Sequence, residues 1–128
     1  MLVSFALEAG GLPRAGTALR AAVIGLWLAR EVPWAAARVP GAVAGVLRLA
    51  LALIPAGLFL VAAWPGQPVA WLHVTLMGGL GLLTLTVASR VVLGHGGQLA
   101  RLRAPNRWFW GVAVLVLAAL ATRGSGDL

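Results

Sequence analysis

Residues 69–89 read VAWLHVTLMGGLGLLTLTVAS, a run without a formal charge. About 20 predominantly apolar residues allow an α-helix to cross the roughly 30 Å hydrocarbon core of a bilayer. The preceding run, residues 41–64, carries only Arg48, which lies near one end and can extend its guanidinium toward the headgroups. Between the two runs stands the uncharged turn WPGQP at residues 64–68. The pattern therefore predicts two antiparallel membrane helices that form a hairpin.

Two further helices are expected, one on each side of this hairpin. Pro105 favours a helix start, and the apolar run behind it predicts a third membrane helix over residues 105–122. A fourth helix is expected at residues 15–29, and Pro33 ends it. Pro55 removes a backbone hydrogen bond inside the first helix of the hairpin, which predicts a kink there.

The predicted fold class is all-α, a transmembrane helical bundle with three membrane helices and a fourth helix near the N-terminus. Hydrophobic residues make up 61% of the 128-residue chain and charged residues 10%, whereas about a quarter of an ordinary soluble domain is charged. The expected division is an N-terminal helix and basic interfacial segment at 1–40, a transmembrane module at 41–123 with spans at about 41–64, 69–89 and 105–122, and a flexible tail at 124–128.

The charge of the chain is strongly basic and unevenly placed. All ten basic residues are arginine, and only Glu8, Glu31 and Asp127 oppose them, which gives a net charge of +7. The arginines stand at the edges of apolar runs, so they indicate membrane topology rather than a nucleic-acid surface, and no nucleic-acid partner is expected. Seven of them occupy or border two connections, which are predicted to be cytoplasmic, with the 64–68 turn and the C-terminus outside: Arg30, Arg38 and Arg48 at one, Arg90, Arg101, Arg103 and Arg107 at the other.

The run at residues 69–89 also carries a histidine at membrane depth. An imidazole that faces lipid is costly, so His73 is expected to face protein or a cofactor. Two interpretations stay open: a hydrogen-bonded histidine inside the bundle, or a metal ligand. Gly78 and Gly81 offer smooth patches for close helix contact. A helical wheel places His73 on one face with Met77, Leu80, Thr84 and Ala88.

The run ends in a second group of polar residues. Arg90 is expected to end the helix on the cytoplasmic side, and Gly94, His95, Gly96 and Gly97 are expected to form the turn after it. The glycines would also let His95 approach a cofactor closely. His73 and Arg90 are about 25 Å apart on a continuous helix, so the two histidines cannot share one metal ion within a chain.

Residues 72–97, LHVTLMGGLGLLTLTVASRVVLGHGG, resemble the hallmark segment of the NnrS family. The resemblance covers about residues 47–120, more loosely from residue 19, and corresponds to the C-terminal portion of that longer family. It implies a multi-pass protein of the bacterial inner membrane that carries haem and copper and is linked to nitric-oxide resistance. It also implies His73 and His95 as ligands of haem or a metal ion and Arg90 as a cofactor contact. The matching positions are Leu72, His73, Thr75, Gly78, Gly81, Arg90, Leu93, Gly94, His95 and Gly97.

Three function hypotheses follow. The first is an NnrS-like haem- or metal-binding membrane module, a fragment or short form, that acts in nitrosative stress. The second is a cofactor-free structural or assembly module, and the third is half of a small transporter or channel, which would need an intramembrane acid that the sequence lacks. The chain has no cysteine, carboxylate pair or Ser-His-Asp set, so no self-contained catalytic centre is expected. The expected partners are the lipid bilayer and other membrane helices, or a second copy, that complete the bundle.

Overall fold

The computed structural model describes residues 1–34, 41–98, 100 and 107–126 of the chain. This part of the chain is helical and contains no strand, which confirms the all-α fold class. The elements are α1 (Leu2–Ala9), α2 (Pro13–Glu31), α3 (Ala42–Ala63), α4 (Pro68–His73), the π-helix η1 (Val74–Gly81), α5 (Leu82–His95) and α7 (Arg107–Gly126).

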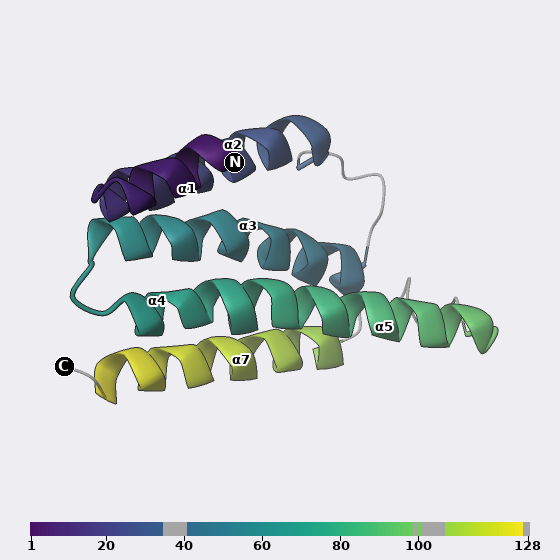
Figure 1. Cartoon of the computed structure of the whole chain (residues 1–128). Coiled ribbons are helices and arrows are strands. Elements are labelled where there is room, and N and C mark those ends of the chain that lie inside the picture. Colours follow the sequence, from purple (N-terminus) through teal and green to yellow (C-terminus); the bar gives the residue numbers. More distant parts are fainter. Residues whose placement is uncertain (35–40, 99, 101–106, 127–128) are drawn as a thin grey trace.

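The helices lie side by side in a layered bundle (Figure 1). The pair α1 and α2 forms one side, α3 comes next, and α7 lies on the other side. Between α3 and α7, the elements α4, η1 and α5 continue one another, and we call residues 68–95 the central helix. Because α3 contacts α2, α7 and all three parts of the central helix, it organises the bundle.

The predicted hairpin is confirmed. α3 and the central helix run antiparallel and are joined by residues 64–67 (Figure 1). The rings of Trp64 and Trp71 lie across this turn with their centroids 6.0 Å apart. The central helix continues beyond the predicted end at Ser89 to His95. Pro55 lies inside α3, and the kink expected there stays a prediction.

Three membrane helices were expected, and this number is wrong, because two helices meet the criteria in the described part of the chain. Only α3 and the central helix are long and apolar enough to cross a bilayer in the part of the chain that the structure describes. The apolar part of α7, Arg107–Thr122, is shorter, and at about 1.5 Å per residue it spans roughly 24 Å of a hydrocarbon core of about 30 Å. Pro105, the expected start of this helix, lies outside the described residues. At its other end α7 runs to Gly126, past the predicted start of the flexible tail.

The N-terminal segment contains one expected and one unexpected helix. α2 covers the predicted helix at 15–29 and begins with Pro13 at its first position. The structure adds α1, which packs against α2 and to which the sequence analysis assigned no helix. Gly16 on α2 permits the close contact, because a Cβ atom at this position would overlap the backbone oxygen of Ser4 and the side chain of Glu8.

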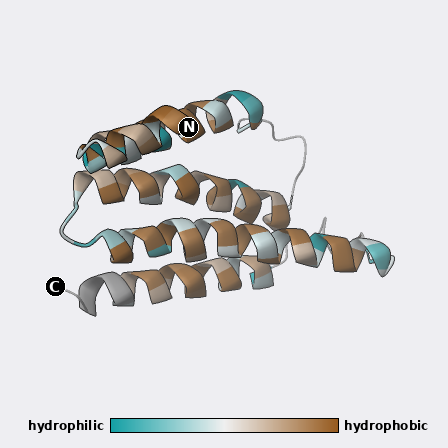
Figure 2. Cartoon of the chain, viewed as in Figure 1, coloured by the Kyte–Doolittle hydropathy of each residue, from teal (hydrophilic) through white to brown (hydrophobic). Residues whose placement is uncertain are grey.

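The apolar residues of the bundle are mostly at its surface. Only 22% of the residues in the most apolar window of α3, and the same share in the central helix, are buried. Apolar residues run along α3, the central helix and α7, while hydrophilic ones gather toward helix ends (Figure 2). A small core forms where α3, α5 and α7 meet, around Val46, Ala50, Leu82 and Ala113. Apolar helices with an exposed apolar surface are consistent with a membrane protein, because a lipid environment can cover that surface.

Several arginines of the two expected basic connections lie at the same end of the bundle, whereas Arg14 lies at the opposite end, where α2 begins. The C-terminal ends of α2 and α5 and the N-terminal ends of α3 and α7 lie at one end of the bundle, which we call the arginine end (Figure 1). Arg30, Arg90 and Arg107 belong to the elements that end or begin there. The 64–67 turn and the C-terminal end of α7 lie at the opposite end. Arg38, Arg101 and Arg103 are outside the described residues.

Candidate functional site

The central helix changes its winding in the segment that carries the motif glycines. Residues 74–81 form a π-helix, and segments of this kind frequently occur at functional sites. The π-helix lies against α3, where the Thr75 hydroxyl donates a hydrogen bond to the backbone oxygen of Ile54 at 3.2 Å. Thr75 therefore ties the π-helix to α3 beside Pro55.

Close packing explains three of the glycines in this contact. A Cβ atom at Gly79 would lie 2.6 Å from Cγ1 of Ile54, and one at Gly57 of α3 would lie 2.6 Å from the backbone nitrogen of Thr75. Gly78 is less confined, because a Cβ atom there would lie 3.0 Å from Cδ1 of Leu120 on α7 and 3.2 Å from Cδ1 of Leu53 on α3. Gly81 was expected to be a packing position, but a Cβ atom there would meet only a backbone oxygen of its own helix, at 3.5 Å.

His73 is the last residue of α4 and stands directly before the π-helix. Its Nδ1 lies 2.6 Å from the backbone oxygen of Val69, one turn earlier. His73 is half-buried, whereas Met77 and Leu80 on the same helix face are 56% and 44% exposed. Thr75, Gly78 and Gly79 on the opposite face make the contact with α3, and the orientation of His73 toward protein or a cofactor stays a prediction.

His95 is exposed and is the last residue of α5. Its Nδ1 lies 2.9 Å from the backbone oxygen of Val91. The predicted turn begins later than expected, because Gly94 and His95 still belong to the helix. Gly97 has a φ of 70°, in the left-handed region that glycine adopts readily, and this residue takes the chain out of the helix.

Both histidines are held in the same way, and their geometry determines which nitrogen is available. A backbone oxygen only accepts hydrogen bonds, so Nδ1 carries the hydrogen in each short contact. In a neutral imidazole the other nitrogen, Nε2, then keeps its lone pair. Metal-binding histidines commonly show this arrangement, with one ring nitrogen bonded to a carbonyl and the other directed at the metal ion.

The structure does not bring the candidate site residues together. His73 and His95 stand at the two ends of the 68–95 helix segment, about 30 Å apart at 1.5 Å per residue. Arg90 is exposed and lies inside α5, so it does not end the helix as predicted. Among the described residues, no three histidine, cysteine or carboxylate side chains are placed to hold one metal ion. The two histidines are therefore not ligands of one shared metal ion within the described chain.

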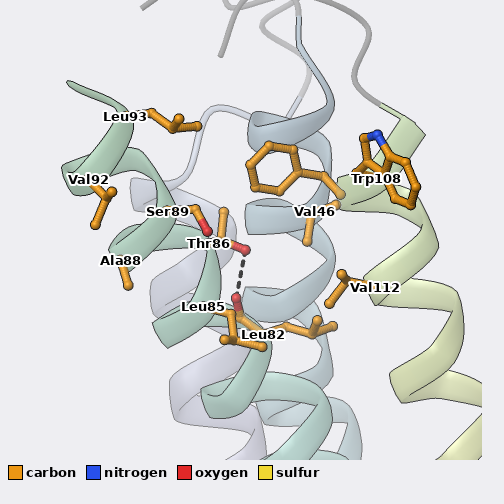
Figure 3. A pocket seen from close by; sticks show the side chains of 11 residues that line it. Val46, Leu82, Leu85, Thr86, Ala88, Ser89, Val92, Leu93, Trp108 and Val112 are labelled. Carbon is orange, nitrogen blue, oxygen red and sulfur yellow. Dashed lines mark hydrogen bonds between the residues drawn. The ribbon is translucent and has the colours of Figure 1, made fainter. Parts of the chain in front are cut away.

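A groove lies between α5 and α7, with α3 behind it (Figure 3). Its volume is about 570 Å³, and no histidine lines it. Leu93 and Trp108 stand at one end of the groove, and Leu82, Leu85 and Val112 lie farther along it (Figure 3). The lining residues are almost all apolar: Val46, Leu82, Leu85, Thr86, Ala88, Ser89, Val92, Leu93, Trp108, Phe109 and Val112.

A polar cluster between α1 and α2 is a feature that the sequence analysis missed. Glu8 forms an ion pair with Arg20, with 2.9 Å between Oε2 and Nη2. Its Oε1 accepts a hydrogen bond from the Thr17 hydroxyl at 3.0 Å. The guanidinium of Arg20 also lies over the ring of Phe5, 4.0 Å from its centroid. These partners, Arg20 first and then Thr17, lower the pKa of the Glu8 carboxyl below its usual value. The spacing of Glu8 and Arg20 gave no signal, because their contact depends on the turn between two helices.

Comparison with known proteins identifies a family. The family model described as "NnrS protein" matches residues 1–127, nearly the whole chain. The match reaches farther toward the N-terminus than the resemblance of the motif at residues 72–97 suggested. No curated protein and no solved structure matches the chain.

Proposed function

The chain belongs to the NnrS family, and we propose that it is a haem-binding module of the bacterial inner membrane that acts in the response to nitric oxide. The family match and the resemblance of residues 72–97 support this assignment. Two apolar helices of membrane-spanning length support a location in a membrane.

The observation that carries the proposal is the backbone bonding of His73 and His95. Each Nδ1 is held by the backbone oxygen one turn earlier, which leaves Nε2 as the donor nitrogen. A haem needs only one or two axial ligands from the protein, and histidine is one of the standard ones. A single, oriented imidazole at each site therefore fits haem.

A copper ion fits the described residues less well. Copper sites are built from several nitrogen or sulfur ligands around one ion. No such group exists among the residues that the structure describes, and the chain has no cysteine. Copper binding would therefore need further ligands from other membrane helices or from a second copy of the chain.

Three residues of the chain would contact haem. His73 would hold one haem by its Nε2 on the side of the 64–67 turn, and His95 would hold another at the arginine end. Arg90 would pair with a propionate there, since a guanidinium forms charge-assisted hydrogen bonds with carboxylates. Bound haem would supply an iron that changes redox state and takes a diatomic ligand such as nitric oxide.

Alanine variants of the two histidines test this assignment. We expect His73→Ala and His95→Ala, purified from cells supplied with haem, each to lose a different component of the haem absorption spectrum. The double variant should lose both components. Gln98→Ala, an exposed change next to the same turn, is the matched control and should leave the spectrum unchanged. Identical and inseparable losses in the two single variants would contradict two independent sites.

A cofactor-free structural or assembly module is the second candidate. The separation of the two histidines and the absence of a multi-ligand group in the described residues favour it. This function predicts that the double alanine variant retains the partners of the unaltered chain. Loss of a bound haem together with loss of nitric-oxide protection would instead support the first proposal.

A further inference from the structure

The groove between α5 and α7 has the chemistry of a site for hydrocarbon. Its volume of about 570 Å³ falls within the range of small-molecule sites, roughly 300 to 1,000 Å³. Its lining contains two hydroxyls, of Thr86 and Ser89, and no charged side chain. The Thr86 hydroxyl already donates to the backbone oxygen of Leu82 at 2.6 Å (Figure 3). The interior therefore offers dispersion contacts and little polarity.

One end of the groove lies close in sequence to two arginines, unlike its apolar interior. Leu93 and Trp108 stand there, where the C-terminal part of α5 and the N-terminal end of α7 lie at the arginine end (Figures 1 and 3). Trp108 is 82% exposed, and tryptophan is enriched at the boundary between hydrocarbon and headgroups. Arg90 follows the lining residue Ser89, and Arg107 precedes Trp108; both arginines are exposed.

We propose that this groove binds an acyl chain of an anionic phospholipid, whose phosphate group meets Arg90 and Arg107. The acyl chain would lie between α5 and α7, against the apolar residues from Leu93 to Leu82. The phosphate would stay at the arginine end, where guanidinium groups form charge-assisted hydrogen bonds with phosphate oxygens.

Charge complementarity selects the headgroup. Few carboxylate side chains oppose the arginines at the arginine end. Glu31 is the only carboxylate in the described part of α2, α3, α5 and α7. Glu8 lies on α1 and is already paired with Arg20. A zwitterionic lipid would bring its own cation toward Arg90 and Arg107, whereas an anionic lipid would not. Each arginine near a membrane surface favours an anionic lipid by roughly fivefold.

Native mass spectrometry after exchange against vesicles tests the site. The vesicles contain equal amounts of phosphatidylglycerol and phosphatidylcholine, and the bound lipids are counted for each variant of the full chain. We expect the unaltered protein to retain phosphatidylglycerol at least fivefold more than phosphatidylcholine. The double variant Arg90→Gln/Arg107→Gln should lose this preference, while Arg30→Gln, an exposed arginine in the last turn of α2, should keep it.

A second pair of variants separates the acyl chain from the headgroup. Val112→Trp fills the groove and should lose the retained lipid of both kinds. Val114→Trp places the same side chain on the same helix at a position that is 60% exposed and outside the lining, so it should retain the lipid.

Three outcomes would overturn the proposal: no headgroup preference in the unaltered protein, equal lipid retention in the two tryptophan variants, or loss of a haem spectrum instead of a lipid in Val112→Trp. Should Val112→Trp fail to fold, as judged by its helical circular dichroism, the exposed arginine variants decide the question by themselves. Arg90 takes part in both proposals, but haem is read by absorption and lipid by mass, and the Val112→Trp and Val114→Trp pair leaves Arg90 and both histidines unchanged, so the two proposals are scored separately.

Discussion

Several polar side chains in this bundle form hydrogen bonds with a backbone oxygen of their own helix. His73 and His95 each bond to the carbonyl one turn earlier, and Thr84 and Thr86 do the same through their hydroxyls. Such contacts satisfy polar groups inside an apolar environment without a partner from another helix. For the histidines they have a further consequence, because the bonded Nδ1 leaves Nε2 as the nitrogen that can bind a metal ion.

The Glu8–Arg20 pair is the main exception, since it joins two helices. We expect Glu8→Gln to loosen α1 from α2 and to speed hydrogen exchange of the α1 amides at neutral pH, because the glutamine cannot form the ion pair. Glu31→Gln, at an exposed position in α2, is the control and should leave α1 unchanged. Equal exchange of α1 in the two variants would show that the pair does not hold this helix.

The lowered pKa of Glu8 sets the direction of the pH effect on the same contact. The folded-state pKa lies below the ordinary value, so the pair contributes stability at pH values above the ordinary carboxyl range. This contribution is lost as the pH falls through the lowered pKa. The unaltered protein should therefore approach the α1 exchange of Glu8→Gln in acid, when each variant is corrected for the intrinsic rate.

At the level of helices, the contact between α3 and the π-helix depends on missing side chains. Gly57 and Gly79 let the two backbones approach, and the Thr75 hydroxyl bonds across the contact. We expect Gly57→Ala to lower the free energy of unfolding by about 1–3 kcal/mol, because the added methyl group meets the Thr75 backbone and the helices must separate. Thermal unfolding in detergent, followed by circular dichroism, measures this change.

Gly111→Ala is the matched control for that substitution. It lies inside α7, and a Cβ atom there would meet nothing within 4 Å. The alanine should leave the unfolding temperature unchanged or raise it, since alanine favours a helix over glycine by up to about 1 kcal/mol. Equal unfolding temperatures for the two variants would mean that the close approach at Gly57 is not needed.

The sequence predicted those elements whose signal is local. Apolar runs on either side of a Pro-Gly turn sufficed for the hairpin of α3 and the central helix, and Pro33 indicated where α2 ends. α1 gave too little signal, because eight residues are short for a periodic pattern and its support comes from Arg20 on the next helix. The π-helix was not predicted either, because its winding is coupled to the contact of Thr75 and Gly79 with α3.

The candidate site was predictable to a similar degree. The resemblance of residues 72–97 identified His73, Arg90 and His95, and their roles stay predictions. Helix geometry alone was enough to separate the two histidines. The groove could not be found from the sequence, because its walls join residues 82–93 to residues 108–112 and to Val46, and only the packing of three helices brings them together.

At the level of the whole molecule, the arrangement of helix ends predicts a topology. The arginine end should face the cytoplasm, and the 64–67 turn and the C-terminus should face outward. A phosphatase fused to the C-terminus should therefore be active, and a fluorescent protein fused there should be dark. This outcome requires the shorter α7 to cross the membrane as well. Fluorescence without phosphatase activity would contradict the topology, either because the orientation is reversed, with the sides assigned to His73 and His95, or because α7 does not cross.

The central claim, that this NnrS-family chain binds haem in a membrane bundle, is tested most directly by one absorption spectrum. The full chain is extracted in detergent, supplied with haem and separated from free haem by size exclusion. We expect a Soret band that elutes with the helical protein and shifts when nitric oxide is added. A well-folded, monodisperse protein that elutes without a Soret band would contradict the claim.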